Sequence, residues 1–401
     1  MNRISKLIGR FTEGSLKLSS AVTSIVILLI VIFLFKEGFG LFNSPTVTKG
    51  YSLYVNAENP VEALSPYEIK KIFNSEIKNW TAVGGGNQEI RLFRFEQIFN
   101  KYSEEELGAD YSLLSKRMNE VIEANPNIIA YFPKEYMTET PAGVQALSVR
   151  NISLTDFFLG KKWLPTTSPA PLFGILPLIG GTLLVSLLAI LIALPLGMGV
   201  SVYLSELAGR RMRKLIRSMI ELLAGIPSVV YGFFGLVVLV PIVQNFGGLE
   251  VGQTAFTGGI ILAIMALPTI ISVSEDAMRN TPDDMRQASY ALGATKWQTI
   301  YKVVVPYASS GISAAVVLGI GRAIGETMAV LMVTGNAAVI PHSLFESVRT
   351  IPASIAAELG EAPVGGTHYQ SLFMLGCVLF VITLIISVLA EVISNRKRVK
   401  G

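Results

Sequence analysis

The sequence contains little charge and few residues that bind metals or form disulfides. Charged residues make up 15% of the 401 positions, whereas hydrophobic residues make up 51%. Cys377 is the single cysteine, which excludes an intrachain disulfide and a cysteine-based metal site. The two histidines, His342 and His368, lie far apart in the sequence, so we expect no metal ion and no cofactor. This composition is typical of a protein that crosses a membrane several times.

The sequence patterns of enzymes are also missing. The pattern Gly-x-x-x-x-Gly-Lys-Ser/Thr, whose loop holds nucleotide phosphates, occurs nowhere in the chain. No nucleophile–base set appears either, so we do not expect an enzyme. The apolar stretch near the N-terminus is not followed by a small-residue cleavage pattern, and we interpret it as a retained membrane anchor.

Six apolar segments approach the ~20 residues that a helix needs to cross a bilayer. Pro195, Pro227 and Pro268 interrupt the second, third and fourth segments, which is tolerated where neighbouring helices satisfy the freed carbonyls. The sequence predicts an all-α polytopic membrane protein with six transmembrane helices. The segments are residues 18–35, 175–204, 216–243, 255–273, 307–333 and 371–393.

Basic residues occupy alternate loops between these segments, whereas the loop at 336–370 contains only Arg349 and the loop at 244–254 contains none. By the positive-inside rule, this alternation predicts that both termini are cytoplasmic. Attraction to membrane lipid explains the basic clusters, so we expect no nucleic acid as a partner. The clusters are Arg3, Lys6, Arg10 and Lys17; Arg210, Arg211, Arg213, Lys214 and Arg217; Arg279, Arg286, Lys296 and Lys302; and Arg396, Lys397, Arg398 and Lys400.

A polar stretch at residues 36–171 is too long for a loop and predicts a small α/β domain on the outer face. Ser65, Pro66 and Glu68 form the pattern of a capped helix start, and residues 104–123 form a second helical run. Extended stretches are expected at 51–55, 89–93 and 128–132. We therefore divide the chain into an N-terminal cytoplasmic segment with the first helix (1–43), the outer domain (44–165) and a core with five transmembrane helices (166–401).

Two polar features accompany the fifth apolar segment. Before it, Thr281, Pro282 and Asp284 predict a helix that Thr281 caps. Within it lie Arg322 and Glu326, one helical turn apart, so we expect them on one face within pairing reach. Ionisable residues at this depth are costly, which leaves two interpretations: a binding site, or a buried ion pair that fixes helix register. Acidic residues at segment ends, such as Glu206, are interpreted as interfacial.

Several stretches carry a resemblance to a known family. From about Leu154 onward the chain resembles the PstC-type permease subunit of bacterial phosphate-specific ABC importers. The stretches that carry it are Phe157 to Trp163, Gly181-Thr182, Ala193 to Gly197, Tyr203 to Glu206, Gly321 to Val330 and Thr334 to Asn336. Such importers also have a loop with Glu-Ala-Ala, Gly and Ile-x-Leu-Pro, which stands here as Gln287, Ala288, Ser289, Gly293, Val303, Val305 and Pro306.

This resemblance implies a transmembrane permease of an ATP-driven phosphate importer in the bacterial inner membrane. Its translocation path would include Arg322, Glu326 and Thr327. The implied partners are a related PstA-type permease, a cytoplasmic PstB-type ATPase dimer and a periplasmic PstS-type phosphate-binding protein. The alternatives are a permease for another oxyanion (molybdate, sulfate or phosphonate) and a membrane sensor of phosphate status. The ATPase-coupling loop would use Gln287, Ala288, Ala291, Gly293 and Pro306, unless the loop helix packs on its own bundle.

The outer domain resembles part of a periplasmic phosphate-binding protein. The resemblance rests on Asn59 to Ser65, Ile69 to Phe73, Glu76 to Trp80, Val83 to Gly85 and Ile129 to Tyr131. In that family a Ser-Gly-Thr helix start holds phosphate with its amides. Here the same place reads Arg94-Phe95-Glu96, so we expect the scaffold without the ligand site.

Overall fold

The computed structural model describes residues 3–44, 47–48, 50–137 and 141–398, and Lys400 of the C-terminal basic cluster lies outside them. The chain divides into two compact units. One contains Met1–Gly38, Leu176–Ala362 and Leu372–Gly401, and the other contains Phe39–Ile175 and Pro363–Ser371. We describe them separately as the membrane unit and the outer unit.

The outer unit is built on a five-stranded mixed sheet with the order β2-β5-β1-β4-β3. The central strand β1 runs antiparallel to both of its neighbours, whereas the edge strands β2 and β3 run parallel to theirs. The strands are β1 (Tyr51–Asn56), β2 (Ala63–Leu64), β3 (Arg91–Arg94), β4 (Ile128–Pro133) and β5 (Val144–Val149).

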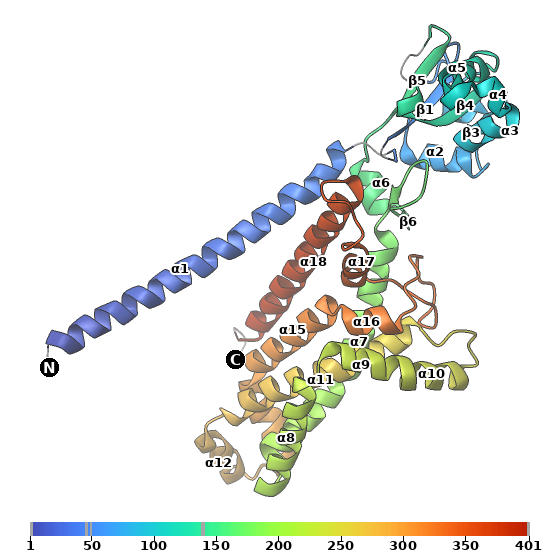
Figure 1. Ribbon diagram of the computed structural model, residues 1–401. Helices are drawn as coiled ribbons and strands as arrows, with labels where there is room; N and C mark the ends of the chain where they lie inside the picture. Colours follow the sequence, from blue (N-terminus) through green and yellow to red (C-terminus); the bar gives the residue numbers. More distant parts are fainter. Residues whose placement is uncertain (1–2, 45–46, 49, 138–140, 399–401) are drawn as a thin grey trace. The chain divides into compact units, whose positions relative to one another are not determined.

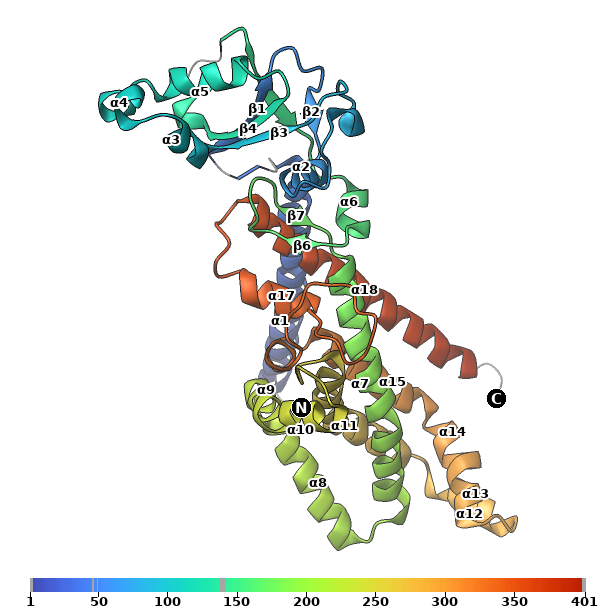
Figure 2. The same cartoon turned by 90° about the vertical axis from the view of Figure 1, so that its right-hand side faces the viewer.

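Both faces of this sheet are covered, because side chains alternate between the faces along each strand. Leu53 and Val55 of β1 pack with α2 (Pro66–Phe73) on one face. Tyr54, between them, packs on the other face with α5 (Leu114–Glu123). Figure 2 shows α2 and α5 on opposite sides of the strands. The outer unit is therefore a small α/β domain, as predicted.

The sequence predicted the start of α2 correctly but misjudged the next helical run. Ser65 and Glu68 form the expected capping box, in which the Ser65 amide donates to Glu68 Oε2 at 2.8 Å. The run at 104–123 is instead broken into α4 (Glu104–Leu107) and α5. Gly108 ends α4 with a φ of +82°, a conformation that glycine adopts readily.

The membrane unit is helical, and its described residues contain five continuous helical runs that are long and apolar enough to cross a membrane. A bent helix pair adds a sixth if it is counted as one span, which agrees with the six predicted segments. The main helices are α1 (Arg3–Gly40), α7 (Leu176–Val202), α8 (Arg210–Gly225), α9 (Ser228–Phe234), α10 (Val240–Gly247), α11 (Ala255–Arg279), α12 (Asp283–Ala291), α15 (Ser309–Gly325), α16 (Met328–Val333), α17 (Ile351–Glu358) and α18 (Thr367–Arg398).

The third predicted segment, 216–243, is not one helix. Its first part belongs to α8, a helix rich in basic residues, and the chain is extended at Ile226 before α9 begins. Pro227 explains the break, because the residue before a proline is disfavoured in helical conformation. The span near this segment runs over Ser228–Gly247.

The fifth predicted segment, 307–333, is broken twice. Helical structure begins already at Lys296 and bends by 70° between Tyr307 and Ser309. The second break follows Gly325, where α15 ends, and α16 begins only at Met328. The two half-helices are therefore separated by Glu326 and Thr327.

Helix α11 packs between α7 and α15 in the membrane unit (Figures 1 and 2). Small residues allow this approach: a Cβ added at Gly197 of α7 would lie 2.8 Å from Ile270 Cγ2 of α11. A Cβ added at Gly319 of α15 would lie 2.8 Å from Ile270 Cγ1. Ile270 thus occupies the space that the two glycines leave, as is common where membrane helices pack closely.

Candidate functional site

Arg322 lies in the last turn of α15, immediately before the break in the helix. Its side chain is half-buried, and Nη1 donates a hydrogen bond to Thr269 Oγ1 of α11 at 3.4 Å. The carbonyl end of a helix attracts a cation, which helps to hold the guanidinium at this place. Among the described residues, Thr269 is its only hydrogen-bond partner, so most of its N–H groups are available for an anion.

Glu326 and Thr327 form the break itself. Glu326 has an extended backbone, with φ −70° and ψ 133°, and its Oε1 accepts from the Ala329 amide of α16 at 3.5 Å. Thr327 Oγ1 donates to the Gly325 carbonyl at 3.2 Å. The expected ion pair with Arg322 is therefore wrong: α15 ends before Glu326, and no ion pair joins the two side chains within the part of the chain that is described.

This arrangement suits an oxyanion better than a structural ion pair would. A guanidinium without a carboxylate partner can hold two oxygens of a tetrahedral anion. The Thr327 hydroxyl and the Ala329 amide of α16 lie a few residues further along the chain, but in this structure they donate to the Gly325 carbonyl and to Glu326. Broken helices of this kind form binding sites near the bilayer midplane in many transporters, because their free backbone groups line the site.

The predicted coupling loop is exposed. Gln287, Ala288 and Ala291 lie on the surface of α12, and no residue of this helix is buried. Gly293 is also exposed and has a φ of +83°, which turns the chain toward α13 (Lys296–Thr299). This exposure favours docking of a partner over packing of the loop on its own bundle.

Three further residues extend this exposed surface. Pro306 lies in the short helix α14 (Val305–Tyr307), just before the bend, and is exposed. The sequence interpretation did not select Leu292 and Trp297, although their side chains are 89% and 63% exposed. Large apolar side chains at such exposure indicate an interaction surface.

The predicted cap of α12 is wrong. The helix begins at Asp283, and Thr281 is buried with its hydroxyl oxygen unpartnered among the described residues. The Thr281 carbonyl accepts a hydrogen bond from Arg286 Nη1 instead. Arg286 thus binds a carbonyl of the chain ahead of the helix, and the helix amides have no side-chain cap.

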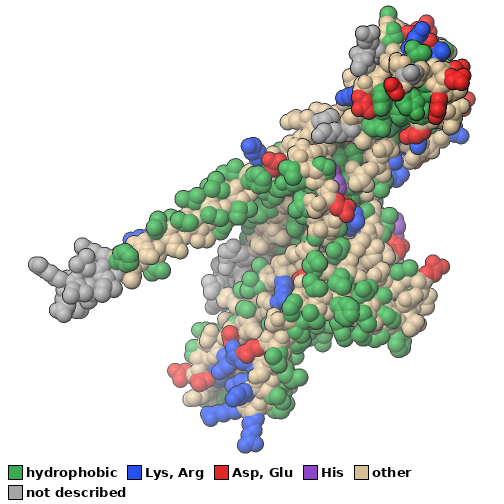
Figure 3. Space-filling model, in the orientation of Figure 1, with side chains coloured by type: hydrophobic (Ala, Val, Ile, Leu, Met, Phe, Trp, Pro, Cys, Tyr) green, Lys and Arg blue, Asp and Glu red, His purple; other side chains and the backbone are tan. Residues whose placement is uncertain are grey.

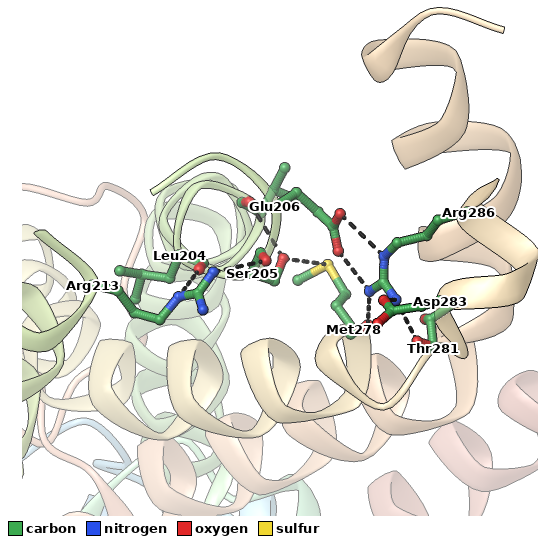
Figure 4. A network of polar contacts seen from close by, with 9 residues as sticks. Leu204, Ser205, Glu206, Arg213, Met278, Thr281, Asp283 and Arg286 are labelled. Atoms are coloured by element: carbon green, nitrogen blue, oxygen red, sulfur yellow. Dashed lines mark hydrogen bonds and ion pairs between the residues drawn. The ribbon is translucent and has the colours of Figure 1, made fainter. Parts of the chain in front are cut away.

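Arg286 and Glu206 form a contact that the sequence interpretation missed (Figure 4). Arg286 Nη2 donates to Glu206 Oε1 at 2.9 Å, and Nε donates to Oε2 at 3.4 Å. The Arg286 side chain is 14% exposed and that of Glu206 is 6% exposed. The hydrogen bonds to Glu206 raise the pKa of Arg286 above its ordinary value, so the guanidinium stays charged. Glu206 is the last residue of one stretch of the family resemblance, and Arg286 directly precedes the loop that begins at Gln287. These positions were the only sign in the sequence that could have pointed to the pair.

The outer unit contains a polar cavity of about 260 Å³ at the end of β3. Arg94 lies over the ring of Phe73, 5.7 Å from its centroid, and Glu96 lines the same cavity. The backbone there forms η3 (Phe95–Gln97), a 3₁₀ turn that continues into the four-residue helix α3 (Ile98–Lys101). The full lining is Thr48, Tyr51, Phe73, Arg94, Glu96, Tyr131, Ser168 and Pro169.

Comparison with known proteins identifies a family and several relatives. The family of binding-protein-dependent transport system inner membrane components matches residues 193–399. The Probable ABC transporter permease protein YqgH of Bacillus subtilis is 43% identical over 257 residues, which are 64% of this chain and 83% of the relative. The phosphate transport system permease protein PstC of Mesorhizobium japonicum is 42% identical over 266 residues, covering 62% and 79%.

Solved structures show weaker likeness. A chain of the MetNI methionine ABC transporter in an inward-facing conformation is 19% identical with a TM-score of 0.44, over 55% of this chain and 96% of that chain. An ABC-type phosphate transport receptor from Vibrio cholerae is 23% identical with a TM-score of 0.20, over 27% and 48%.

The family match covers more than half of the sequence, and both relatives are matched over most of their own length. The spans found in the structure agree with a multi-pass membrane subunit. The chain therefore belongs to the binding-protein-dependent transport system inner membrane components, and it is a permease subunit of an ABC transport system rather than an enzyme.

Proposed function

We propose that this chain is the transmembrane permease subunit of an ATP-driven importer of inorganic phosphate. The observation that carries the proposal is Arg322, a half-buried cation at a helix break whose only hydrogen bond among the described residues goes to a neutral hydroxyl. A relative with 42% identity that is named as a phosphate transport permease supports phosphate as the anion.

Arg322, Glu326 and Thr327 act together on the passing anion in this proposal. Arg322 attracts the oxyanion by charge and by two-point hydrogen bonding. The Thr327 hydroxyl adds a donor when it exchanges its bond to the Gly325 carbonyl for one to the anion. Glu326 holds the start of α16 by accepting a hydrogen bond from the Ala329 amide. Its negative charge repels the bound anion and so weakens the binding. A site that bound phosphate too tightly would not release it, so a nearby carboxylate favours passage.

The partners follow from the family and from the exposed loop. A PstB-type ATPase dimer docks on α12 and its surroundings, at Gln287, Ala288, Ala291, Gly293 and Pro306. A related PstA-type permease completes the path as a heterodimer, and a PstS-type protein delivers phosphate from outside. Both termini are cytoplasmic, and residues 1–43, 44–165 and 166–401 are the anchor, outer domain and transport core of an inner-membrane protein.

Replacing Arg322 with Gln tests the site. We expect phosphate uptake to fall about thirty-fold or more, because truncating a buried group that pairs with a charge costs several kcal/mol. Arg322→Lys should keep part of the uptake, since it retains the charge but not the planar fork. The control is Arg211→Gln, on the exposed surface of α8, which should transport normally.

Uptake of labelled phosphate into vesicles that contain the full complex is the measurement. Normal uptake by Arg322→Gln would remove Arg322 from the path. The same assay with competing molybdate, sulfate and phosphonate tests the anion, because a guanidinium binds any tetrahedral oxyanion. Uptake that another anion suppresses more strongly than unlabelled phosphate does would overturn phosphate as the substrate.

A further inference from the structure

One side chain of helix α12 is largely buried among the membrane helices. No residue of α12 is buried as a whole among the described residues, and Ser289 Oγ lies 2.9 Å from Thr299 Oγ1 of the neighbouring loop helix α13. Helix α12 also packs against η8 (Ile300–Val304). The largely buried side chain is that of Arg286, which extends from α12 into the packed helices. A partner docked on the exposed surface of α12 would therefore act on the bundle through Arg286.

Arg286 contacts the ends of two different helices, as Figure 4 shows. It binds both carboxylate oxygens of Glu206 in η6 (Tyr203–Leu207), the π-helical turn that continues α7. Arg286 Nη2 also donates to the Met278 carbonyl near the C-terminus of α11, at 3.0 Å. One guanidinium thus joins α12 to α7 and to α11, the two helices that pack most extensively in this unit.

The π-helical turn η6 is held from its other side as well (Figure 4). Arg213 of α8 donates from Nε to the Leu204 carbonyl at 2.7 Å and from Nη2 to the Ser205 carbonyl at 3.1 Å. These carbonyls have no helical partners at the end of α7, so the arginine satisfies them. With its backbone fixed in this way, η6 presents Glu206 to Arg286 in a defined position.

We propose that the Glu206–Arg286 pair couples movement of the docked α12 to the transport helices, with both residues as positioning residues. Helix α11 completes the connection, because Arg286 binds its Met278 carbonyl and Arg322 binds Thr269 a few turns earlier on the same helix. Packed helices transmit a displacement when they have discrete arrangements and firm contacts at their ends. This inference rests on the proposed function, since it assigns the coupling step of the same transporter.

The structure explains why this pair is arginine and glutamate. The planar guanidinium binds the two carboxylate oxygens and still reaches a carbonyl on each side, which an ammonium group cannot do at one time. Breaking a largely buried pair leaves an uncompensated charge, whereas removing both charges often costs little stability. A double variant that lacks both charges can therefore be stable and still fail to couple, whereas a purely structural pair predicts normal coupling in such a variant.

The experiment measures phosphate transported per ATP hydrolysed, in vesicles that contain the complete complex. Glu206→Gln should lower this ratio about ten-fold while ATP hydrolysis continues, in the range of typical coupling between sites. Glu206→Asp should give an intermediate ratio. The double variant Glu206→Gln/Arg286→Met should recover the thermal stability of the wild type and still show the low ratio.

Glu358→Gln is the matched control. It breaks the pair with Arg349, in which Arg349 Nη1 lies 2.6 Å from Glu358 Oε1. Both side chains of this pair are largely buried, like those of Glu206 and Arg286, but the pair lies in the loop region between α16 and α18. We expect a loss of stability and an unchanged ratio.

If either Glu206→Gln or the double variant transports as much phosphate per ATP as the wild type, the proposal is overturned. This holds also when uptake and ATP hydrolysis both fall by the same factor, because the ratio is then unchanged. If the wild-type complex transports a different anion, the proposed function fails, and the same ratio measured with that anion still tests the pair.

Discussion

Three arginines of the membrane unit show that the partner decides what a guanidinium does. Arg213 binds carbonyls at the end of a helix, and Arg286 binds a buried carboxylate. Arg322 has only a long hydrogen bond to a hydroxyl among the described residues. Neutral carbonyls satisfy the N–H groups of Arg213, and the carboxylate of Glu206 compensates the charge of Arg286. The proposed anion site uses Arg322 because most of its N–H groups have no partner among the described residues.

The Thr269–Arg322 hydrogen bond should orient the guanidinium. Replacing Thr269 with Val removes the acceptor and keeps the shape of the side chain. One hydrogen bond contributes about 1 kcal/mol, so phosphate uptake at low substrate should fall about five-fold. Thr383→Val on α18, whose hydroxyl bonds only its own helix, is the control and should leave uptake unchanged. Equal uptake by the two variants would show that Thr269 does not position Arg322.

Glu68 in the outer unit gives a prediction that depends on pH. Burial raises the pKa of its carboxyl, but hydrogen bonds from Ser65 and the charge of Arg150 outweigh burial and lower the pKa below 4.5. A carboxyl whose pKa is lower in the folded state stabilises the fold above its unfolded pKa, and this contribution is lost as the pH falls through the folded value. Glu68→Gln should therefore destabilise α2 by about 1 kcal/mol at pH 7.

The difference from wild type should shrink as the pH falls below 4.5, the ordinary value. Hydrogen–deuterium exchange of the α2 amides in the full-length protein measures it. Glu62→Gln, in an exposed loop, should show no such difference. A destabilisation that is the same at every pH would contradict an ionised Glu68 as the cause.

At the scale of elements, packing depends on where small residues lie. The apolar face of α1 is largely exposed, but near its end Gly38 contacts α18 closely: an added Cβ would lie 2.9 Å from Cys377 Sγ. Phe33 of α1 also packs edge-on against Phe373 of α18, with 5.6 Å between ring centroids. These contacts hold the first and last spans together.

This contact can be tested with a disulfide, because Cys377 is the single cysteine. The position of an added Cβ at Gly38 is close to the spacing that a disulfide requires. Gly38→Cys should therefore form an intramolecular bond with Cys377 under mild oxidation, seen by mass spectrometry of the linked peptides. Gly14→Cys is the control, since nothing lies within 4 Å of its added Cβ. Two free thiols in oxidised Gly38→Cys would contradict the packing of α1 on α18.

At the scale of the whole molecule, charge and apolar surface are separated along the membrane unit. Figure 3 shows hydrophobic side chains over the helices and basic side chains gathered at the end where α8 and α12 lie. Such a pattern is expected of a protein whose apolar surface faces lipid and whose basic end stays in the cytoplasm.

Cysteine labelling tests this orientation. In a Cys377→Ser background, Gln287→Cys should react with a membrane-impermeant maleimide only after the cells are permeabilised. Glu361→Cys, in the exposed loop before α18, should react in spheroplasts that are intact. The opposite pattern would reverse the topology, and with it the assignment of α12 to the ATPase side.

The sequence by itself determined the class of protein, the apolar segments that provide its spans, the small α/β domain after the first of them and the capping box at Ser65. These features depend on composition, on apolar length and on interactions between residues that are near in sequence, so they can be read locally. Arg322 and the residues of the coupling loop could also be selected in this way, because charge within an apolar run and a motif spacing are visible without a structure.

Only the tertiary structure decided how these residues meet. The break after Gly325 separates Glu326 from Arg322, although their spacing predicted a pair. The pair of Glu206 and Arg286 joins residues far apart in the chain, and Thr281 does not cap α12 but offers its carbonyl to Arg286. Such contacts depend on which helix ends come together, and packing across the bundle decides this rather than the sequence near each end.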